Sequence, residues 1–236
     1  GSRGGRQQRG GPARGNDLRY DLEITLEQAY AGAEVELTVP ATLTCETCEG
    51  SGAKPGTSPT QCTTCHGAGR VRASQGFFSI ERACPRCGGS GRMVMDPCSD
   101  CRGQGQIRKN RTLAVRIPAG VATGQKLKLK ARGDAPRGSG PEGDLYVIVS
   151  VADHPLFRRR GDDLLVDVPL TFVDATLGAD IDVPTLDGRT TIRIPPGTPT
   201  GKIFRLAGRG LPHLGRNERG DLHLQVQLEI PESLSV

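Results

Sequence analysis

The chain has 236 residues, enough for one or two ordinary domains, and contains no apolar run long enough to cross a membrane. Its formal net charge is +5, but four of its 31 basic residues lie in the first sixteen positions, which contain no acid. The remaining chain therefore has 27 basic residues against 26 acidic ones. A nucleic-acid-binding domain normally carries a strongly basic face, so this balance argues against nucleic acid as the main partner.

Residues 1–16 consist mainly of glycine and arginine and contain no aromatic side chain. We expect this tract to be the remnant of a flexible Gly/Arg linker. The alternative is an RNA-binding tract, but proteins that bind single strands stack the bases on aromatic rings. Gly1-Ser2 resembles the scar of a cleaved tag, so a targeting segment could have preceded it. Since the sequence shows no secretory signal, we expect a cytoplasmic protein.

Short helix signals and alternating segments follow the linker. Thr25 and Thr171 each precede a helix-forming stretch that ends at a glycine, Gly32 or Gly178. Threonine caps the start of a helix, and glycine closes its end in the left-handed αL conformation. Apolar and polar residues alternate in three segments, 112–117, 125–130 and 221–228. This period of two predicts half-buried antiparallel strands, so the expected fold class is mainly β with short helices.

All eight cysteines lie in four copies of the motif Cys-x-x-Cys-x-Gly-x-Gly. The pairs are Cys45 and Cys48, Cys62 and Cys65, Cys84 and Cys87, and Cys98 and Cys101. One pair offers two thiolates to a tetrahedral Zn²⁺, and two pairs complete a site of four cysteines. Four pairs therefore predict two zinc ions per chain, with a structural role because no coordination position stays open. The glycines indicate a sharp turn after each second cysteine.

Other interpretations fit the cysteines less well. A disulfide framework agrees with the even count, but adjacent Cys-x-x-Cys pairs suit a metal better than a staple between distant loops. A redox dithiol would stand singly beside a βαβ pattern, which is missing here. His66 follows Cys65 and is a possible ligand, although four thiolates per ion leave it unneeded. Residues 45–105 contain only eleven apolar side chains besides cysteine, too few for a core, so zinc must hold them.

The sequence outside this cysteine module repeats itself. The segment 115–145 matches 192–222 at an offset of 77, and the segment 18–37 matches 164–183 at an offset of 146. Internal repetition of this kind implies two copies of one domain. The offsets differ by 69 residues, so the cysteine module is an insertion into one hairpin of the first copy. Its two ends must then lie close together.

These observations predict the domain organisation. We expect two tandem homologous β-sandwich-like domains: the first comprises 17–44 and 106–153, the zinc module 45–105 is inserted in it, and the second comprises 154–236. If the ends of the module meet, the first and fourth cysteine pairs are neighbours. The nested pairing then places Cys45, Cys48, Cys98 and Cys101 on one zinc, and Cys62, Cys65, Cys84 and Cys87 on the other. A RING-like interleaving of the pairs is the alternative.

The tandem Cys-x-x-Cys-x-Gly-x-Gly motifs inside a repeated β-domain resemble the zinc-containing class of the DnaJ family of co-chaperones. The resemblance covers nearly the whole chain. The family's J-domain has no counterpart, because His154-Pro155 is followed by Leu156 and not by the aspartate of the His-Pro-Asp signature. The family ends in a dimerising segment, whereas this chain ends just after its last expected strand. We therefore expect a non-enzymatic, substrate-binding fragment of a protein that is a homodimer at full length.

The resemblance also implies partners and a client site. Members of the family hold unfolded or partly folded polypeptides, prevent their aggregation and deliver them to a DnaK-type ATPase chaperone. In relatives, an apolar groove of the first β-domain pairs with a client strand by β-augmentation. The matching positions here are Leu18, Leu37, Val39 and Val147, together with Leu113 or Val115; ordinary core packing is the alternative for each. Relatives carry a larger aromatic residue at Val147, so a wider, shallower pocket is expected.

In the family, the inner zinc site, formed by the first and last cysteine pairs, acts in client holding, and the outer one acts in cooperation with the partner chaperone. Two further functions compete with the co-chaperone. One is a thiol-disulfide oxidoreductase that uses a Cys-x-x-Cys pair, and the other is a zinc-ribbon nucleic-acid binder with a steep salt dependence. No Ser/His/Asp set, phosphate loop or open metal position supports an enzyme.

Overall fold

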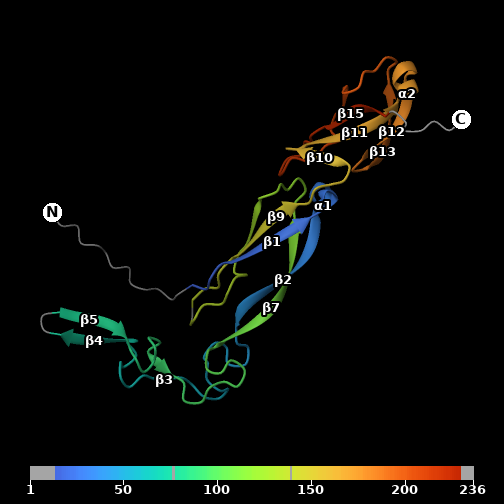
Figure 1. The fold of residues 1–236 in the computed structure, drawn as a ribbon. Coiled ribbons are helices and arrows are strands. Elements are labelled where there is room, and N and C mark those ends of the chain that lie inside the picture. The colour runs from blue at the N-terminus through green and yellow to red at the C-terminus, as the bar shows by residue number, and fades with distance from the viewer. Residues whose placement is uncertain (1–13, 76–77, 139, 230–236) are drawn as a thin grey trace. The chain divides into compact units, whose positions relative to one another are not determined.

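The structure is a computed structural model that describes residues 14–75, 78–138 and 140–229 (Figure 1). It is mainly β, which confirms the predicted fold class. The contacts divide the chain into two units. The first contains residues 14–19, Thr38–Thr112 and Lys128–Tyr146, and the second contains Tyr20–Leu37, Leu113–Leu127 and the described residues from Val147 onward. The domain limits expected from the sequence stay predictions.

The first copy of the repeat consists of five strands and one short helix. They are β1 (Leu18–Ile24), α1 (Leu26–Ala31), β2 (Ala33–Thr44), β7 (Gln106–Ile117), β8 (Lys126–Leu129) and β9 (Leu145–Val151). One sheet has the strand order β1-β9-β8, and β2 pairs with β7 in a second sheet of two strands. The predicted strands 112–117 and 125–130 correspond to the end of β7 and to β8.

The cysteine module contains two short antiparallel pairs of strands between β2 and β7. They are β3 (Thr60–Gln61) with β6 (Arg92–Met93), and β4 (Arg70–Gln75) with β5 (Phe78–Ala83). The buried residues of its two small clusters are the cysteines themselves, with only a few partly buried neighbours such as Ile107, Val71 and Met93. Because almost no apolar side chain is buried here, the module depends on what its cysteines bind.

The second copy has the same order of elements after one additional strand, β10 (Phe157–Arg160). The others are β11 (Asp163–Thr171), α2 (Phe172–Leu177), β12 (Ala179–Thr185), β13 (Gly188–Ile194), β14 (Ile203–Leu206) and β15 (Leu222–Glu229). The main sheet has the order β10-β11-β15-β14, in which only β11 and β15 run parallel. Alternate residues of β11 and β15 form the core; Leu164, Val166, Leu222 and Leu224 are at most 2% exposed.

The two copies repeat their backbone hydrogen bonds at the offset of 77. In the first copy, the N–H of Gly133 donates to the carbonyl of Gly143 over 2.9 Å. In the second copy, Gly210 donates to Gly220 over 2.8 Å. The sequence repeat is therefore a structural repeat as well.

The offset of 146 recurs in the same way. The N–H of Asp144 donates to the carboxylate of Asp17 over 2.7 Å, and the N–H of Asp221 donates to that of Asp163 over 2.7 Å. Asp144 and Asp221 are related by 77, whereas Asp17 and Asp163 are related by 146. Both offsets therefore describe one duplicated arrangement that an insertion interrupts in the first copy.

The predicted helix caps are correct at the start of each helix and only partly correct at the end. Thr25 and Thr171 accept the N–H groups of Gln28 and Asp174. Gly32 has φ 75° and ψ 156°, and Gly178 has φ 81° and ψ 150°. The positive φ explains the glycine, but αL requires a ψ near 45°. The expected αL closure is wrong, because the chain turns directly into the next strand.

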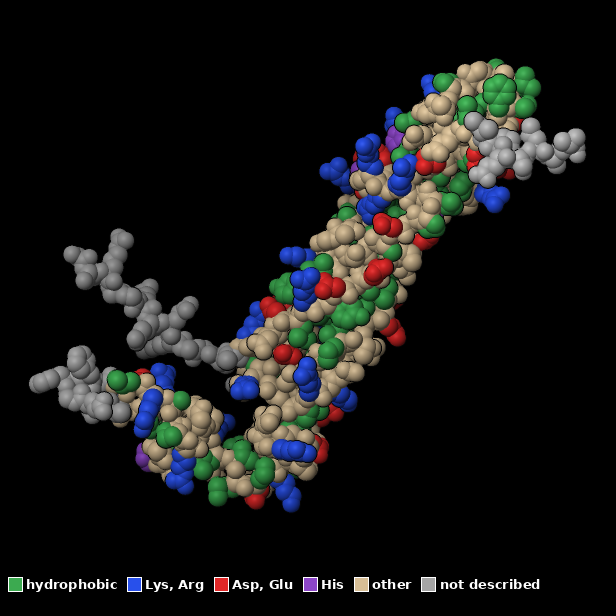
Figure 2. All heavy atoms as spheres, in the orientation of Figure 1, with side chains coloured by type: hydrophobic (Ala, Val, Ile, Leu, Met, Phe, Trp, Pro, Cys, Tyr) green, Lys and Arg blue, Asp and Glu red, His purple; other side chains and the backbone are tan. Residues whose placement is uncertain are grey.

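The helices of the two copies differ in their burial. Leu26 of α1 is 3% exposed and belongs to the core cluster around Phe157 and Leu164. At the equivalent position of α2, Phe172 is 71% exposed, and Leu177 is 72% exposed. Figure 2 shows hydrophobic side chains gathered where Figure 1 places α2. Among the described residues, no helix has the length and apolarity needed to span a bilayer.

Replacing Asp144 or Asp221, which the repeat relates, is expected to make the free energy of unfolding depend less on pH in the acid range. The ammonium of Lys128, the N–H of Ala131 and the guanidinium of Arg14 hold the pKa of Asp144 well below its usual range. The N–H of Gly208 and the side chain of Arg205 lower the pKa of Asp221 in the same way. A carboxylate with a lowered folded-state pKa stabilises the fold above its unfolded pKa, about 4 for Asp, and loses this contribution as the pH falls.

The measurement is the urea-unfolding free energy of wild type, Asp144→Asn and Asp221→Asn between pH 7 and pH 2.5. Both variants should be less stable at pH 7, and their difference from wild type should shrink below about pH 4. Because all three proteins have the same remaining acid-labile groups, the difference isolates the aspartates. A difference that does not depend on pH would contradict this assignment.

Candidate metal centre

Each Cys-x-x-Cys-x-Gly-x-Gly segment folds into the same tight turn. The residue after the second cysteine has φ between 49° and 60° in all four turns: Glu49, His66, Gly88 and Arg102. The first glycine of each motif has φ between 83° and 97° (Gly50, Gly67, Gly89, Gly103), and the second has φ between 68° and 75° (Gly52, Gly69, Gly91, Gly105). Side chains are strained in this region, so the turn explains both glycines of the motif.

The turn points a backbone N–H at the second sulfur of each motif. The N–H of the second glycine donates to that Sγ over 3.2–3.3 Å: Gly52 to Cys48, Gly69 to Cys65, Gly91 to Cys87, and Gly105 to Cys101. Hydrogen bonds of this kind favour the thiolate, which is the form that binds a metal. The second glycine therefore supplies a hydrogen-bond donor to the site in addition to its conformation.

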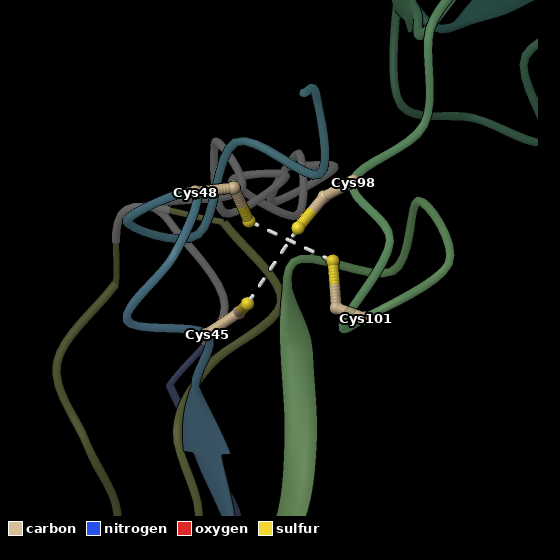
Figure 3. A group of neighbouring side chains, drawn as sticks. All are labelled: Cys45, Cys48, Cys98 and Cys101. Atoms are coloured by element: carbon tan, nitrogen blue, oxygen red, sulfur yellow. Dashed lines mark hydrogen bonds between the residues drawn. The ribbon is translucent and has the colours of Figure 1, made fainter. Parts of the chain in front are cut away.

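The first quartet of sulfurs brings the two ends of the module together. Cys45 follows β2 and Cys101 precedes β7, and the four side chains of Cys45, Cys48, Cys98 and Cys101 point inward toward one centre (Figure 3). The Sγ atoms of Cys45 and Cys98 are 4.0 Å apart, and those of Cys48 and Cys101 are 3.6 Å apart. All four residues are buried.

The second quartet has the same geometry within the outer part of the module. It contains Cys62, Cys65, Cys84 and Cys87. The Sγ atoms of Cys62 and Cys84 are 3.9 Å apart, and those of Cys65 and Cys87 are 3.7 Å apart. Both quartets join the pairs in the nested order expected from the repeat, and neither joins them in the interleaved order.

The nested pairing is fixed by contacts between partner turns. The N–H of Cys45 donates to the carbonyl of Gly105, and the N–H of Cys98 donates to that of Gly52. A Cβ on Gly105 would lie only 2.3 Å from the carbonyl oxygen of Gly50. The same contacts recur in the second quartet, where a Cβ on Gly91 would lie 2.4 Å from the oxygen of Gly67. The glycines therefore let two turns approach closely enough to share one centre.

The distances between the sulfurs fit zinc. Four sulfurs at 2.3 Å from a tetrahedral Zn²⁺ are about 3.8 Å from one another, and the four sulfur–sulfur distances lie on either side of that value. A disulfide would bring two sulfurs to about 2.05 Å. All eight cysteines are free. Both quartets can therefore hold a divalent thiophilic ion, and Zn²⁺ there would supply structural cross-links.

Two thiols of the second quartet differ in their ionisation. Burial opposes ionisation of Cys87, but N–H groups of Gly91 and Gly89 help to lower its pKa to about 6. Burial raises the pKa of Cys65 to about 11. A divalent ion bound between them would favour the thiolate form of its ligands. His66 is exposed and belongs to neither quartet.

Sequence reasoning missed one contact between partner turns. The hydroxyl of Thr47, between the cysteines of the first motif, donates to the carboxylate of Asp100, between those of the fourth. This hydrogen bond lowers the pKa of Asp100. Residues inside Cys-x-x-Cys pairs carry no general signal, so only the paired geometry reveals their role.

The structure places the six predicted groove residues in two classes. Leu37, Val39, Val115 and Val147 are buried, with exposures of 4% or less. Leu18 and Leu113 are partly exposed. The four buried residues pack as core, and the two others present apolar surface on β1 and β7.

The fold and the cysteine quartets define a duplicated β protein whose first copy carries two inserted groups of four cysteines that can each hold a metal ion. The chain belongs to the DnaJ C-terminal domain family, since residues 15–231 match the family described as "DnaJ C terminal domain". This confirms the resemblance seen in the sequence.

Three bacterial relatives named "Chaperone protein DnaJ" show the same relationship. The chain is 58% identical over 240 residues to that of Caulobacter vibrioides, covering 98% of this chain and 62% of the relative. It is 52% identical over 235 residues to that of Sinorhizobium fredii, with coverage of 98% and 62%. The protein of Nitrosomonas europaea is 50% identical over 222 residues, with coverage of 94% and 60%. The chain thus spans about three fifths of the length of these relatives, and their name is that of a chaperone.

Proposed function

We propose that this chain is the polypeptide-binding part of a DnaJ-type co-chaperone. It holds unfolded or partly folded polypeptides, prevents their aggregation and passes them to a DnaK-type ATPase chaperone. The observation that carries the proposal is the family membership over residues 15–231, with relatives named as chaperones. Two structural Zn²⁺ ions hold the cysteine module, and the protein at full length is a cytoplasmic homodimer without enzymatic activity.

The client site is proposed on the strands of the first copy. Among the described residues, β2 pairs with no strand other than β7, and the segment 134–135 bonds to the backbone of Thr42. The rest of its second edge is the proposed place for a client strand. An extended client strand can add to such an edge by β-augmentation. Leu18 and Leu113 offer partly exposed apolar surface, while Leu37, Val39, Val115 and Val147 are buried.

Replacing Leu113 by aspartate is expected to weaken protection of a denatured client at least about fivefold, since a charge on apolar contact surface costs roughly 1 kcal/mol or more. The measurement is light scattering of chemically denatured luciferase diluted into buffer with each variant. Leu113 is preferred to Val39, because an aspartate at a 4%-exposed site would disturb the fold itself.

The matched control is Ile203→Asp, an equally charged change at a residue that is 51% exposed in the second copy. Full protection by a folded Leu113→Asp variant, as judged by circular dichroism, would remove the groove from the proposal. Loss of protection in both variants alike would assign the effect to charge in general.

The alternative of a thiol-disulfide oxidoreductase is not favoured. Seven of the eight cysteines are buried, and the sulfurs that face each other are 3.6–4.0 Å apart. Reaction of the zinc-loaded chain with a thiol reagent should therefore be slow until a chelator is added. Rapid modification of two thiols with zinc still bound would support the oxidoreductase.

A further inference from the structure

A hollow of about 530 Å³ opens in the first unit beside the first cysteine quartet. It is lined by residues at the end of β2, at the start of β7 and in the segments 14–16 and 134–137. Three arginines line it, Arg14, Arg108 and Arg137, against a single carboxylate, Asp134. Neither the metal centre nor the proposed client groove uses these side chains.

Two of the three guanidinium groups are available to a ligand. Arg14 is committed, since it pairs with Asp144 at 2.6 Å and with Asp17 at 3.0 Å. Arg108 and Arg137 make no ion pair or hydrogen bond with any residue that the structure describes, and both are exposed. Asp134 accepts the N–H of Thr42 over 2.7 Å and, among the described residues, forms no ion pair with either arginine. Two unpaired guanidinium groups therefore stand against one carboxylate, which leaves the described lining of the hollow with a net positive charge.

The neutral groups of the hollow suit a polypeptide. The amide of Gln106 donates to the carbonyls of Ala135 and Pro136 over 2.8 and 2.9 Å, which fixes this wall and leaves the Gln106 Oε1 as an acceptor. The exposed amide of Gln104 lies at the same rim. Guanidinium groups bind carboxylates through paired hydrogen bonds, and these amides can meet the N–H and C=O groups of a main chain.

Nucleic acid fits the hollow less well. Its lining contains no aromatic side chain on which a base could stack. Beyond residue 16 the chain has nearly equal numbers of basic and acidic residues, so no extended basic track continues from the hollow. We propose that this hollow binds an acidic segment of a polypeptide, with Arg108 and Arg137 as the residues that recognise its carboxylates. This site is independent of the proposed apolar groove.

The test measures fluorescence anisotropy of a labelled eight-residue peptide, with four glutamates spaced by glycine and serine, titrated with the zinc-loaded chain. Arg108→Gln and Arg137→Gln should each weaken binding about fivefold, the upper range for an exposed ion pair, and raising the salt should weaken it further. Arg193→Gln in β13 removes the same charge from another exposed site and should change nothing.

Three outcomes would overturn the proposal. They are equal binding of a matched glutamine peptide, equal weakening by Arg193→Gln, and tighter binding of a labelled single-stranded oligonucleotide that depends on Arg108 and Arg137. Binding of inorganic phosphate at millimolar concentration without any peptide binding would reduce the hollow to a simple anion site and would also contradict the proposal. Since the readout uses no denatured client, its failure leaves the chaperone proposal untouched.

Discussion

Replacing Cys98 by serine is expected to remove one zinc ion from the chain and to unfold the part of the cysteine module that adjoins β2 and β7. Cys98 is fully buried, and its sulfur lies 4.0 Å from that of Cys45. A structural zinc site contributes on the order of 10–16 kcal/mol, and the described residues of the module form no larger apolar cluster that could replace it. Loss of one thiolate should therefore weaken metal binding at this site by at least about a thousandfold. The second quartet should keep its ion, since its four ligands are untouched.

The measurement is zinc content by mass spectrometry with limited proteolysis. Cys98→Ser should bind one zinc and be cleaved near Cys45 and Cys101, at the two ends of the module. Cys84→Ser is the matched variant, because it should also bind one zinc but be cleaved only between Cys62 and Cys87. Retention of two zinc ions in either variant would contradict the independence of the two metal centres. Unfolding of the second copy of the repeat in both variants would contradict it as well.

Replacing Gly105 by alanine is expected to be nearly as damaging, although it removes no ligand. Its Cβ would lie 2.3 Å from the oxygen of Gly50, and Gly105 has φ 71°. The contact is with backbone and cannot be relieved by turning a side chain. To accept the methyl group, the partner turns must separate, which also weakens the N–H donation from Gly105 to Cys101. Loss of such a supporting contact typically lowers metal affinity about 10–100-fold.

The control variant Gly56→Ala distinguishes the effect of the close contact between the turns from the effect of backbone strain at a positive φ. Gly56 lies in the same module with φ 86°, but a Cβ there would meet nothing within 4 Å. It should cost about 1 kcal/mol of strain and leave zinc affinity nearly unchanged. Competition for zinc with a chromogenic chelator compares the two variants. Equal affinities would show that the close approach of the turns does not matter for the metal.

The sequence predicts the composition of the metal centre but not what holds its two halves together. Spacing within each motif is local, so four Cys-x-x-Cys pairs are sufficient to predict two sites of four cysteines each. The contact between Gly105 and Gly50 joins turns that are far apart in the chain, and no spacing rule contains it. The repeat offsets supply this long-range information indirectly, because they show that the ends of the module must meet.

Burial separates the better predictions from the weaker ones. Alternation in 221–228 correctly predicts the strand β15, with Leu222, Leu224 and Val226 in the core. Alternation also selects Leu37 and Val39, but it cannot distinguish core from groove, since both are apolar. The hollow with Arg108 and Arg137 depends on segment 134–137, which the backbone bond from Asp134 to Asn16 helps to position. No local sequence pattern predicts this hollow.

We expect each chain to hold two zinc ions, each bound by four thiolates in nested pairs. Zinc K-edge X-ray absorption on the metal-loaded chain, with metal content measured on the same sample, is the sharpest test. It should give two zinc ions per chain and a shell of four sulfurs at about 2.3 Å. A shell that includes nitrogen or oxygen, or a content of one zinc per chain, would contradict it.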